Sequence, residues 1–515
     1  MKKFTSLLFI AISFCACTVE NSQNETLSPN PSSPVSKTEL DQVIFKNLQS
    51  QGKFEWSSVS DVMVWSALNQ SDKVLSVGYK PADEGDINSK IHLIDINETA
   101  WKTAREKVLD IIFEEESKTN NSLKRSELEV FQENILPVID VRVSNLSTIE
   151  RLRASKLVRY AEPMGYTPSI QTEKSNANSK INSDSGCGSN TAETGLGSAD
   201  YTVITPNAKA SWNFAYHGVT QAWAKSTGAG AKMVIIDTGC SDAQENLGSA
   251  FNQGASSGRT IEKLVTLPRD TFLGIPIGPT ETPNDGCGHG TSMQGAACAP
   301  RGTDGNTAGI AYNANLISIH AAADVFLNES RESKGVADAF TLAGNRADVR
   351  VISMSMGNII SSSQVADGVR YAYGKGKLIF CAAGTSFSWT AGWAGVIFPA
   401  SMAEAVAVTG IKDNLTQRCD ACHEGSDVDF VVVMERVSDS RKPLSLAMSG
   451  DTPSTVGGSS VATASTAAMA TLVFSKFPTL TRDQVFDRLK QNASYYPSRN
   501  GNFGWGRINI NNALN

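Results

Sequence analysis

The chain lacks a long apolar run beyond its first residues, and it has no sustained cluster of lysine and arginine. The first absence argues against a protein built of membrane spans, which need about 20 apolar residues each. The formal net charge is −6 over 515 residues. This argues against nucleic acid as the main partner, because such binders concentrate positive charge. Composition is otherwise that of a globular protein, and two or three domains are expected.

The N-terminus has the pattern of an export signal. Two lysines precede a short apolar stretch, residues 4–16, which is too short for a normal membrane span. The end of this stretch, FCAC, resembles a bacterial lipoprotein box, with Phe14 where that box usually has Leu. We expect residues 1–17 to be a signal, Cys17 to carry lipid in the cell envelope, and residues 18–39 to be a polar tether. A plain signal peptide cut nearby is the alternative.

The region 40–165 is typical of a small α+β domain. Its order of strand, helix, strand, helix and strand suggests a ferredoxin-like sandwich. The expected strands cover residues 73–80, 136–144 and 157–163, and the expected helices cover 97–115 and 147–156. Residues 166–200 are polar and aperiodic, which indicates a linker.

From residue 201 to 515 the pattern changes to apolar, β-branched runs that alternate with helical segments. This predicts a doubly wound α/β domain with a mostly parallel sheet covered on both faces. Such sheets place their sites at the carboxyl ends of the strands. The expected strands are 233–237, 315–321, 349–357, 378–384, 405–410 and 429–434.

Three segments of this domain contain candidates for catalysis. Asp237 ends an apolar strand, where it is either an ordinary turn residue or a carboxylate that orients a histidine. His289 lies between two glycines at the start of a small-residue helix, a setting that suits a general base. A third segment, GGSSVATAS from Gly457, begins another helix. Its serines are either helix caps or a nucleophile near a helix N-terminus, where backbone N–H groups favour an oxyanion.

Only five histidines are present, so few positions compete with His289. His92 and His320 are expected in apolar strands, as residues of the core. His217 and His423 lack a catalytic setting in the sequence.

The segments together resemble the subtilase family of serine proteases. The order Asp, His, Ser is that of subtilisin. The family's serine motif Gly-Thr-Ser-Met-Ala aligns with Gly458 to Ala462, which makes Ser460 the candidate nucleophile, although Ala464 replaces the usual Pro. The segments that carry the resemblance are VIIDTG, GHGTSMQGAA, AGIAYNANLISIHA, VISMSMG, CAAG, FPAS, AVAVTG, GGSSVATAS and FGWGRINI.

The resemblance implies a mechanism and a substrate class. His289 would take the proton from Ser460, and Asp237 would hold the imidazole tautomer. Ser460 would attack a peptide bond of a protein or peptide and form an acyl-enzyme, with no cofactor and no catalytic metal. The segment Ser355, Met356 and Gly357 would pair with the extended substrate. Members of the family often bind structural calcium. This sequence has no uninterrupted calcium-ligand motif, so whether it binds calcium stays open.

One family residue is replaced in the segment that follows the strand 378–384. The family has Gly-Asn there, and the Asn amide donates to the oxyanion, whereas this chain has Gly384 and Thr385. The Thr385 hydroxyl is therefore expected to fill the role in part. This departure supports a second reading, a weak or inactive subtilase fold that binds peptides. A hydrolase acting on esters is a third reading.

The resemblance also extends to the N-terminal domain, which is similar to a subtilase propeptide. A propeptide leaves its last strand in the active site as an inhibitor, and residues 158–166 would be that strand. We expect self-cleavage between about residues 163 and 200, and a monomeric product in the envelope, the periplasm or the medium. An unrelated α+β domain is the alternative.

Seven cysteines remain after the signal, so at least one thiol is left over if the others pair. Cys419 and Cys422, followed by His423, favour a disulfide or free thiols over zinc, because no second ligand pair follows. The proposed triad would bring Cys240 and Cys287 close to each other, which makes a bridge between them plausible.

Overall fold

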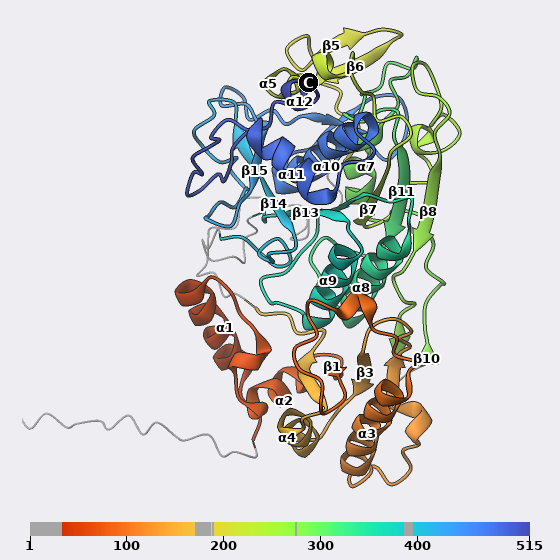
Figure 1. Ribbon diagram of the computed structural model, residues 1–515, viewed down its shortest axis with the longest axis vertical. Coiled ribbons are helices and arrows are strands. Elements are labelled where there is room, and N and C mark those ends of the chain that lie inside the picture. The colour runs from red at the N-terminus through yellow and green to blue at the C-terminus, as the bar shows by residue number, and fades with distance from the viewer. Residues whose placement is uncertain (1–32, 170–186, 188–189, 273–274, 386–394) are drawn as a thin grey trace, which may run out of the picture.

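The computed structural model describes residues 33–169, 187, 190–272, 275–385 and 395–515 (Figure 1). The predicted signal, its Cys17 and most of the predicted tether lie outside the described residues, as does most of the segment 170–189. The described residues form an N-terminal part and a larger C-terminal part that pack against each other.

The N-terminal part contains an antiparallel sheet of four strands in the order β2-β3-β1-β4. With its two crossover helices, α3 and α4, this is the order of a ferredoxin-like βαββαβ unit, as predicted. The short strand β2 and the helices α1 and α2 were not expected from the sequence. The elements are α1 (Lys37–Gln51), α2 (Asp61–Asn69), β1 (Val74–Tyr79), α3 (Thr99–Glu116), β2 (Glu129–Phe131), β3 (Val138–Arg142), α4 (Leu146–Ala154) and β4 (Val158–Pro163).

The C-terminal part is built on a seven-stranded parallel sheet in the order β15-β14-β13-β12-β7-β11-β8. The predicted α/β fold is therefore confirmed, with β8 as an additional edge strand. The chain order changes direction at β7, which creates the crevice where such sheets place their sites. The strands are β7 (Lys232–Asp237), β8 (Ile261–Val265), β11 (Asn315–His320), β12 (Val351–Met354), β13 (Leu378–Ala382), β14 (Val406–Lys412) and β15 (Phe430–Glu435).

Helices cover both faces of this sheet and bury two apolar cores. In β7, Met233 and Ile235 point into the core beneath α7 and α10, whereas Val234 and Ile236 point into the core beneath α8 and α9. This alternation follows from the two-residue period of a strand. The main helices are α7 (His289–Cys298), α8 (Ser330–Asn345), α9 (Ser363–Gly374), α10 (Gly458–Lys476) and α11 (Arg482–Gln491).

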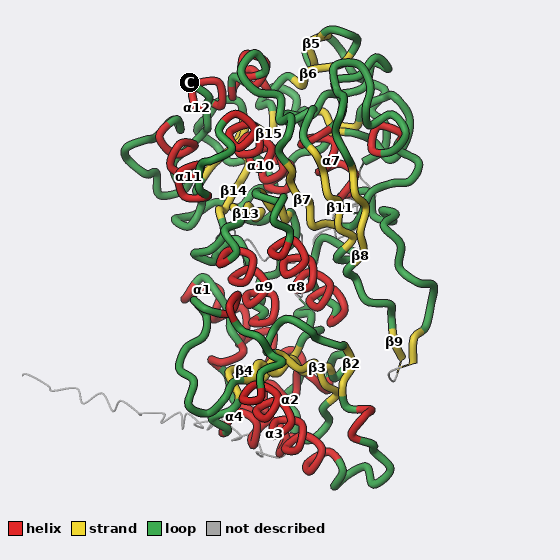
Figure 2. The backbone as a smooth tube through the Cα atoms, turned by 45° about the vertical axis from the view of Figure 1, so that its right-hand side comes forward, coloured by secondary structure: helices red, strands yellow, loops and turns green. Residues whose placement is uncertain are grey.

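Shorter elements complete the C-terminal part. The pair β9 and β10 lies in the long connection between β8 and α7 and projects beside the N-terminal part (Figure 2). The remaining elements are β5 (Tyr201–Ile204), β6 (Ala208–Ser211), α5 (Phe214–His217), α6 (Val219–Ala222), β9 (Thr271–Phe272), β10 (Ile275–Pro276), β16 (Leu444–Ser445), β17 (Ser454–Thr455) and α12 (Ile510–Ala513).

The N-terminal sheet rests on α8 and α9, so these two helices lie between the two sheets (Figure 2). Buried polar contacts join the parts. Arg159 of β4 binds Asp367 of α9 through two hydrogen bonds of 2.7 and 2.8 Å, and both side chains are largely buried. Glu162, also in β4, accepts hydrogen bonds from the Ser363 N–H at 3.0 Å and the Ser363 hydroxyl at 2.7 Å. Glu162 thus satisfies a backbone donor at the start of α9.

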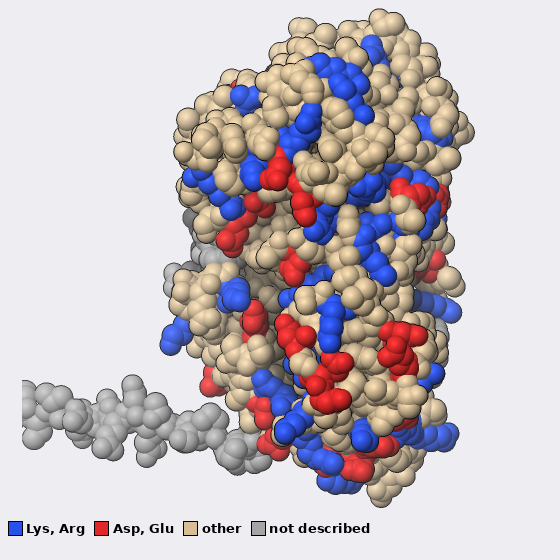
Figure 3. Space-filling view, viewed as in Figure 1, with Lys and Arg blue, Asp and Glu red and all other residues tan. Residues whose placement is uncertain are grey.

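The outer surface of the N-terminal part carries both signs of charge, intermingled on the face shown in Figure 3. Ion pairs such as Arg105–Glu129 and Arg151–Glu114 lie on this part. Exposed pairs of this kind add little to stability. These pairs lie within the N-terminal part, whereas the buried contacts with α9 and a buried ion pair between Lys334 of α8 and Glu133 join the two parts.

The prediction that residues 158–166 lie in the active site is wrong. Strand β4 pairs with β1 inside the N-terminal sheet. The chain then turns back to α1, where the Tyr166 hydroxyl donates to Asp41 at 2.6 Å and the Ser169 N–H donates to the same carboxylate at 2.8 Å. Backbone pairing with β1 and the buried Asp41 carboxylate hold this segment in its own domain.

We predict that the Glu162 carboxyl makes stability depend on pH. Burial raises the pKa of Glu162 to about 7, despite the opposing hydrogen bonds from Ser363. The folded state therefore favours the protonated acid, so its contribution is complete below about pH 4.5 and is lost as the pH rises to about 7. Glu162→Gln does not ionise, so it should gain stability relative to the wild type between pH 5 and pH 8, by up to about 3 kcal/mol.

Thermal unfolding midpoints of both proteins at the two pH values measure this change. Glu150→Gln, at an exposed position of α4, is the control and should track the wild type. An equal difference between wild type and Glu162→Gln at both pH values would contradict the prediction.

Candidate active site

The structure places Asp237 and His289 in direct contact. Asp237 is the last residue of β7 and is 1% exposed, and His289 is the first residue of α7. The His289 Nδ1 lies 2.7 Å from Asp237 Oδ1, which also accepts the Thr238 N–H at 2.8 Å. Because the carboxylate only accepts, Nδ1 carries a hydrogen and Nε2 is the free nitrogen of the neutral ring.

The surroundings of His289 favour its charged form. Burial by itself would lower the pKa of His289, but the charge and hydrogen bond of Asp237, and then the charges of Asp285 and Asp324, raise it above its ordinary value. A histidine in this environment accepts a proton more readily than a free imidazole.

Ser460 is the third residue of α10, near the positive end of the helix dipole. Its Oγ lies 3.3 Å from the Ser355 carbonyl, and the Ser355 hydroxyl donates to the Ser460 carbonyl at 2.9 Å. The turn before it requires Gly458, whose φ of +84° is strained for other residues.

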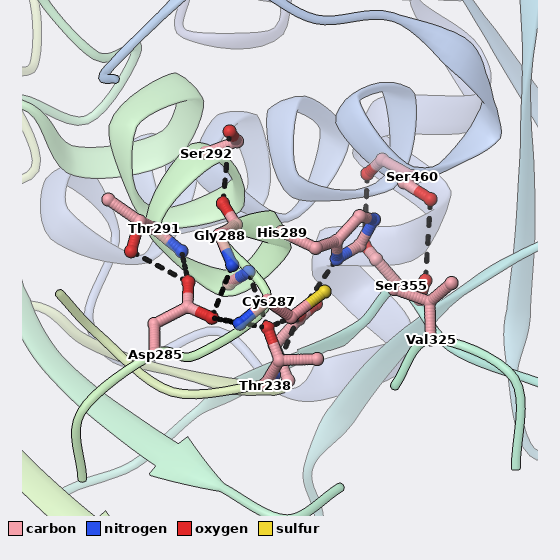
Figure 4. A network of polar contacts seen from close by, with 12 residues as sticks. Thr238, Asp285, Cys287, Gly288, His289, Thr291, Ser292, Val325, Ser355 and Ser460 are labelled. Atoms are coloured by element: carbon pink, nitrogen blue, oxygen red, sulfur yellow. Dashed lines mark hydrogen bonds and ion pairs between the residues drawn. The ribbon is translucent and has the colours of Figure 1, made fainter. Parts of the chain in front are cut away.

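A cavity of about 250 Å³ brings the predicted site residues together. Its wall is mostly apolar and includes His289 and Ser460, and Asp237 lies behind the histidine. Figure 4 shows Ser460 and Thr238 on opposite sides of the His289 ring. The other lining residues are Val325, Phe326, Ser355, Met356, Gly357, Ala382, Gly384, Thr385, Ile397, His423, Thr455, Val456, Gly457 and Ser459.

Thr385 lines this cavity beside the start of α10. Its hydroxyl lies 3.0 Å from the hydroxyl of Ser459, and one of the two donates to the other. Because each hydroxyl has one hydrogen, a proton supplied by Ser459 leaves the Thr385 hydrogen free to point into the cavity.

The predicted substrate-binding segment is partly occupied by the protein itself. The Gly357 N–H donates to the Val325 carbonyl at 3.2 Å, and the Gly357 carbonyl accepts the Leu327 N–H at 3.2 Å. A substrate strand needs free backbone groups. An extended peptide can therefore pair with Gly357 only after residues 325–327 move, whereas Ser355 and Met356 lie in the cavity wall.

A buried glutamate holds the loop that contains residues 325–327. Glu332 of α8 is 1% exposed and accepts four backbone N–H groups at 3.1 to 3.2 Å, from Ala323, Asp324, Asn328 and Glu329. Burial raises its pKa to about 7.

Asp285, four residues before His289, was missed by the sequence reasoning. It is fully buried and accepts five hydrogen bonds of 2.6 to 3.0 Å (Figure 4). One bond comes from the Thr238 hydroxyl, which follows Asp237, and the others come from the N–H groups of Cys287, Gly288 and Thr291 and from the Thr291 hydroxyl. Asp285 thus joins the end of β7 to the start of α7. An Asp before a glycine-rich turn, as in DGCGHG, was the available signal.

The predicted bridge between Cys240 and Cys287 is wrong. Cys287 pairs with Cys187, and Cys240 is a buried thiol whose side chain packs in the core under α7. Asn190 also contacts this site, since its side chain donates to the Gly288 carbonyl at 2.5 Å. Cys419 and Cys422 form a disulfide, one of the two alternatives preferred over zinc.

Of the remaining histidines, His217 and His320 are buried as structural residues. The ring of His217 contacts the Ile508 carbonyl and accepts the Val433 N–H, so both nitrogens are used. The prediction for His92 is wrong, because this residue is half-buried in a short 3₁₀ turn instead of lying in a core strand. His423, for which the sequence indicated no catalytic setting, lines the cavity.

A sequence profile described as the subtilase family matches residues 228–506, more than half of the chain. The chain belongs to the subtilase family. The matched range includes Asp237, His289 and Ser460, together with all seven strands of the large sheet.

Individual relatives of this subtilase are distant. Thermitase of Thermoactinomyces vulgaris is 30% identical over 194 residues, which are 38% of this chain and 60% of that protein. Subtilisin Savinase of Lederbergia lenta is 28% identical over 286 residues, which are 55% of this chain and 90% of that protein. The alkaline protease of Alkalihalobacillus alcalophilus is 28% identical over 64% of its length. The chain thus spans less than two thirds of the first and third of these relatives.

Among solved structures, MycP1 from Mycobacterium smegmatis aligns over 64% of this subtilase and 88% of its own chain, with 20% identity and a TM-score of 0.48. Within the described residues, no group of three or more His, Cys, Asp or Glu side chains is arranged to hold a metal ion. Within the same residues, every helix is too short or too polar to cross a membrane.

We predict that Asp285→Asn impairs the site without removing any residue of the Asp237, His289 and Ser460 set. An amide nitrogen would face N–H donors, so the turn before His289 should shift, and kcat should fall by about 10- to 100-fold, since a displacement of 1 Å can cost about 100-fold. Loss of the nearby charge should also lower the pKa of His289. The acid limb of the pH profile of kcat/KM should therefore move to lower pH.

The control is Asp242→Asn, at an exposed carboxylate in the segment that follows β7. It should leave both the rate and the pH profile of the wild type unchanged. A slow Asp285→Asn enzyme with an unshifted acid limb would contradict the electrostatic part of this prediction.

Proposed function

We propose that this subtilase is an exported serine endopeptidase that cleaves protein or peptide substrates. The observation that carries the proposal is the 2.7 Å contact between Asp237 and His289, with Ser460 on the wall of the same cavity. These three residue types, in this relation, are those of a Ser-His-Asp triad.

In the proposed reaction, His289 Nε2 removes the proton from the Ser460 hydroxyl as that oxygen attacks the substrate carbonyl. Asp237 holds the ring by its Nδ1–H and stabilises the imidazolium that forms. His289 then gives its proton to the leaving amine, and an acyl group remains on Ser460. Water activated by His289 cleaves this ester and restores the enzyme. The chemistry requires no cofactor.

The oxyanion of the tetrahedral intermediate would be stabilised by the Ser460 N–H at the start of α10 and by the Thr385 hydroxyl. The 3.0 Å contact with Ser459 supports this role, since it gives the Thr385 hydroxyl a defined orientation. A threonine hydroxyl is shorter than an asparagine amide, so we expect a slower enzyme than one with two well-placed donors.

The N-terminal part is proposed to be a propeptide that stays bound until it is cut off. Its buried contacts with α9 through Arg159 and Glu162 support a stable association. The cut is proposed within the predicted range, between Gly165 and Cys187, because residues from Cys187 onward are tied to the C-terminal part. Residues 1–17 are proposed to direct export, with Cys17 lipidated at the cell envelope, and the product is proposed to be a monomer.

A weak or inactive peptide-binding module is the second candidate function. The occupied backbone of Gly357 and the replacement of the family's Asn by Thr385 favour it. An ester hydrolase uses the same groups and differs only in its substrate.

We predict that the wild type reacts with a fluorophosphonate probe and hydrolyses casein, and that Ser460→Ala does neither. The probe bonds to an activated serine, so labelling separates an enzyme from a binding module. Casein hydrolysis separates a peptidase from an esterase. A folded wild type that the probe does not label would contradict both the peptidase and the esterase hypotheses.

We predict that self-cleavage separates the two parts. N-terminal sequencing of the wild type should find a new terminus between Gly165 and Cys187, and Ser460→Ala should stay intact. A cut before Cys187 leaves no disulfide between the two parts, so they should run apart on a non-reducing gel. A cut after Cys187 would instead leave them joined through Cys287. Cleavage of Ser460→Ala at the same site in a protease-free preparation would refute self-processing.

We predict that Thr385→Val lowers kcat by up to about 100-fold with little change in KM, as expected for a bond made in the transition state. Valine keeps the shape and removes the hydroxyl. Thr385→Asn should raise kcat if its amide reaches the oxyanion. Equal kcat values for the wild type and Thr385→Val would exclude the hydroxyl as a donor.

A further inference from the structure

The segment Cys419-Asp420-Ala421-Cys422-His423 forms a loop closed by the Cys419–Cys422 disulfide, and no step of the proposed reaction uses it. Both cysteines are buried. The Cys419 N–H donates to the Gly410 carbonyl of β14 at 3.0 Å, and the Cys422 N–H donates to the Cys419 carbonyl at 3.0 Å. A Cβ at Gly410 would lie 2.7 Å from Cys422 Sγ, so the disulfide packs directly on the strand.

The other side of this loop contacts the backbone at Thr385. The His423 N–H donates to the Gly384 carbonyl at 2.9 Å, and Cys422 pairs with Thr385 in an antiparallel bridge. Gly384 has a φ of +125°, and a Cβ there would lie 2.4 Å from His423 Nδ1. The loop therefore determines where the backbone of Gly384 and Thr385 can lie.

The His423 ring makes a second connection to the same region. Its Nδ1 lies 2.9 Å from the Gly395 carbonyl. Because a carbonyl only accepts, Nδ1 must carry the hydrogen. Burial lowers the pKa of His423 to about 4, so the ring is neutral at pH 7 and keeps this single donor. His423 thus binds the chain both before Thr385, at Gly384, and after it, at Gly395.

We propose that the disulfide-closed loop 419–423 is a positioning element that holds the Thr385 hydroxyl in the cavity. The proposal rests on the proposed function, in which this hydroxyl is an oxyanion donor. A hydroxyl on Cβ has little reach, so the backbone that carries it must be placed within about 0.5 Å of the productive geometry. The loop provides that placement from β14, and Cys419 and Cys422 themselves do not line the cavity.

A double-mutant cycle in the full-length protein tests the proposal. The variants are Cys419→Ala/Cys422→Ala, Thr385→Val and the triple variant. We expect the double cysteine variant to lose about tenfold in kcat with KM changed less than about twofold, because only a transition-state contact is weakened. In the Thr385→Val background, removal of the disulfide should lower kcat by less than about twofold, since its target is already absent. Asp420→Asn, an exposed position in the same loop, is the matched control and should match the wild type.

Multiplicative effects in the triple variant, or an unchanged kcat in the double cysteine variant, would overturn the proposal. If the double cysteine variant does not fold, the pair His423→Asn and His423→Leu replaces it. Asparagine retains a donor toward the Gly395 carbonyl and leucine does not, so kcat should be higher in His423→Asn, and equal values would refute the proposal. If fluorophosphonate does not label the wild type, the proposed function itself is refuted. The labelling experiment therefore distinguishes failure of the proposed function from failure of the positioning proposal.

Discussion

The buried Asp285 carboxylate is the interaction on which the geometry of the candidate active site depends. Burying an ionised carboxylate costs several kcal/mol unless it is compensated. Here five donors compensate it, and hydrogen bonds to a charged group contribute about 1.5–3 kcal/mol each. Because the donors come from the end of β7 and from the turn into α7, the same bonds that stabilise the charge fix Asp237 relative to His289.

The interface between the two parts of the chain combines buried polar contacts with shared apolar cores. Arg159, Glu162 and their partners on α9 are removed from water, so they specify one docking geometry more strongly than an apolar contact would. The segment after β4 belongs to this arrangement and not to the cavity. The N-terminal part therefore contacts the C-terminal part mainly through α8 and α9, on the side of the sheet opposite α7 and α10.

Much of this architecture could be predicted from the sequence. Apolar runs with β-branched residues indicated six of the seven strands of the large sheet, and the motifs around Asp237, His289 and Ser460 lie where the structure brings them together. The edge strand β8 was missed because it is only half buried and has two charged residues, Glu262 and Lys263.

Long-range pairings were the part that sequence patterns could not supply. Cys240 is as close to the site in sequence as Cys287 is, but its side chain faces the core, and the partner of Cys287 arrives from a segment 100 residues earlier. The role of His423 likewise depends on distant backbone groups, at Gly384 and Gly395, that folding brings to it. Asp285 binds mainly N–H groups close to it in sequence, and only its Thr238 partner comes from far along the chain. Backbone donors and acceptors are present at every position, so composition and spacing give no sign of which ones a side chain will meet.

The disulfide between Cys187 and Cys287 has a consequence for where the protein can be assembled. It closes a loop that contains β7 and Asp237, with its cysteines 100 positions apart. In the chain-entropy description, closing a loop of this length stabilises the folded state by about 4.7 kcal/mol. That amount is a large fraction of the net stability of a typical domain, about 5–15 kcal/mol. In a reducing cytosol this contribution is absent, so the turn before His289 reaches its full stability only in an oxidising compartment.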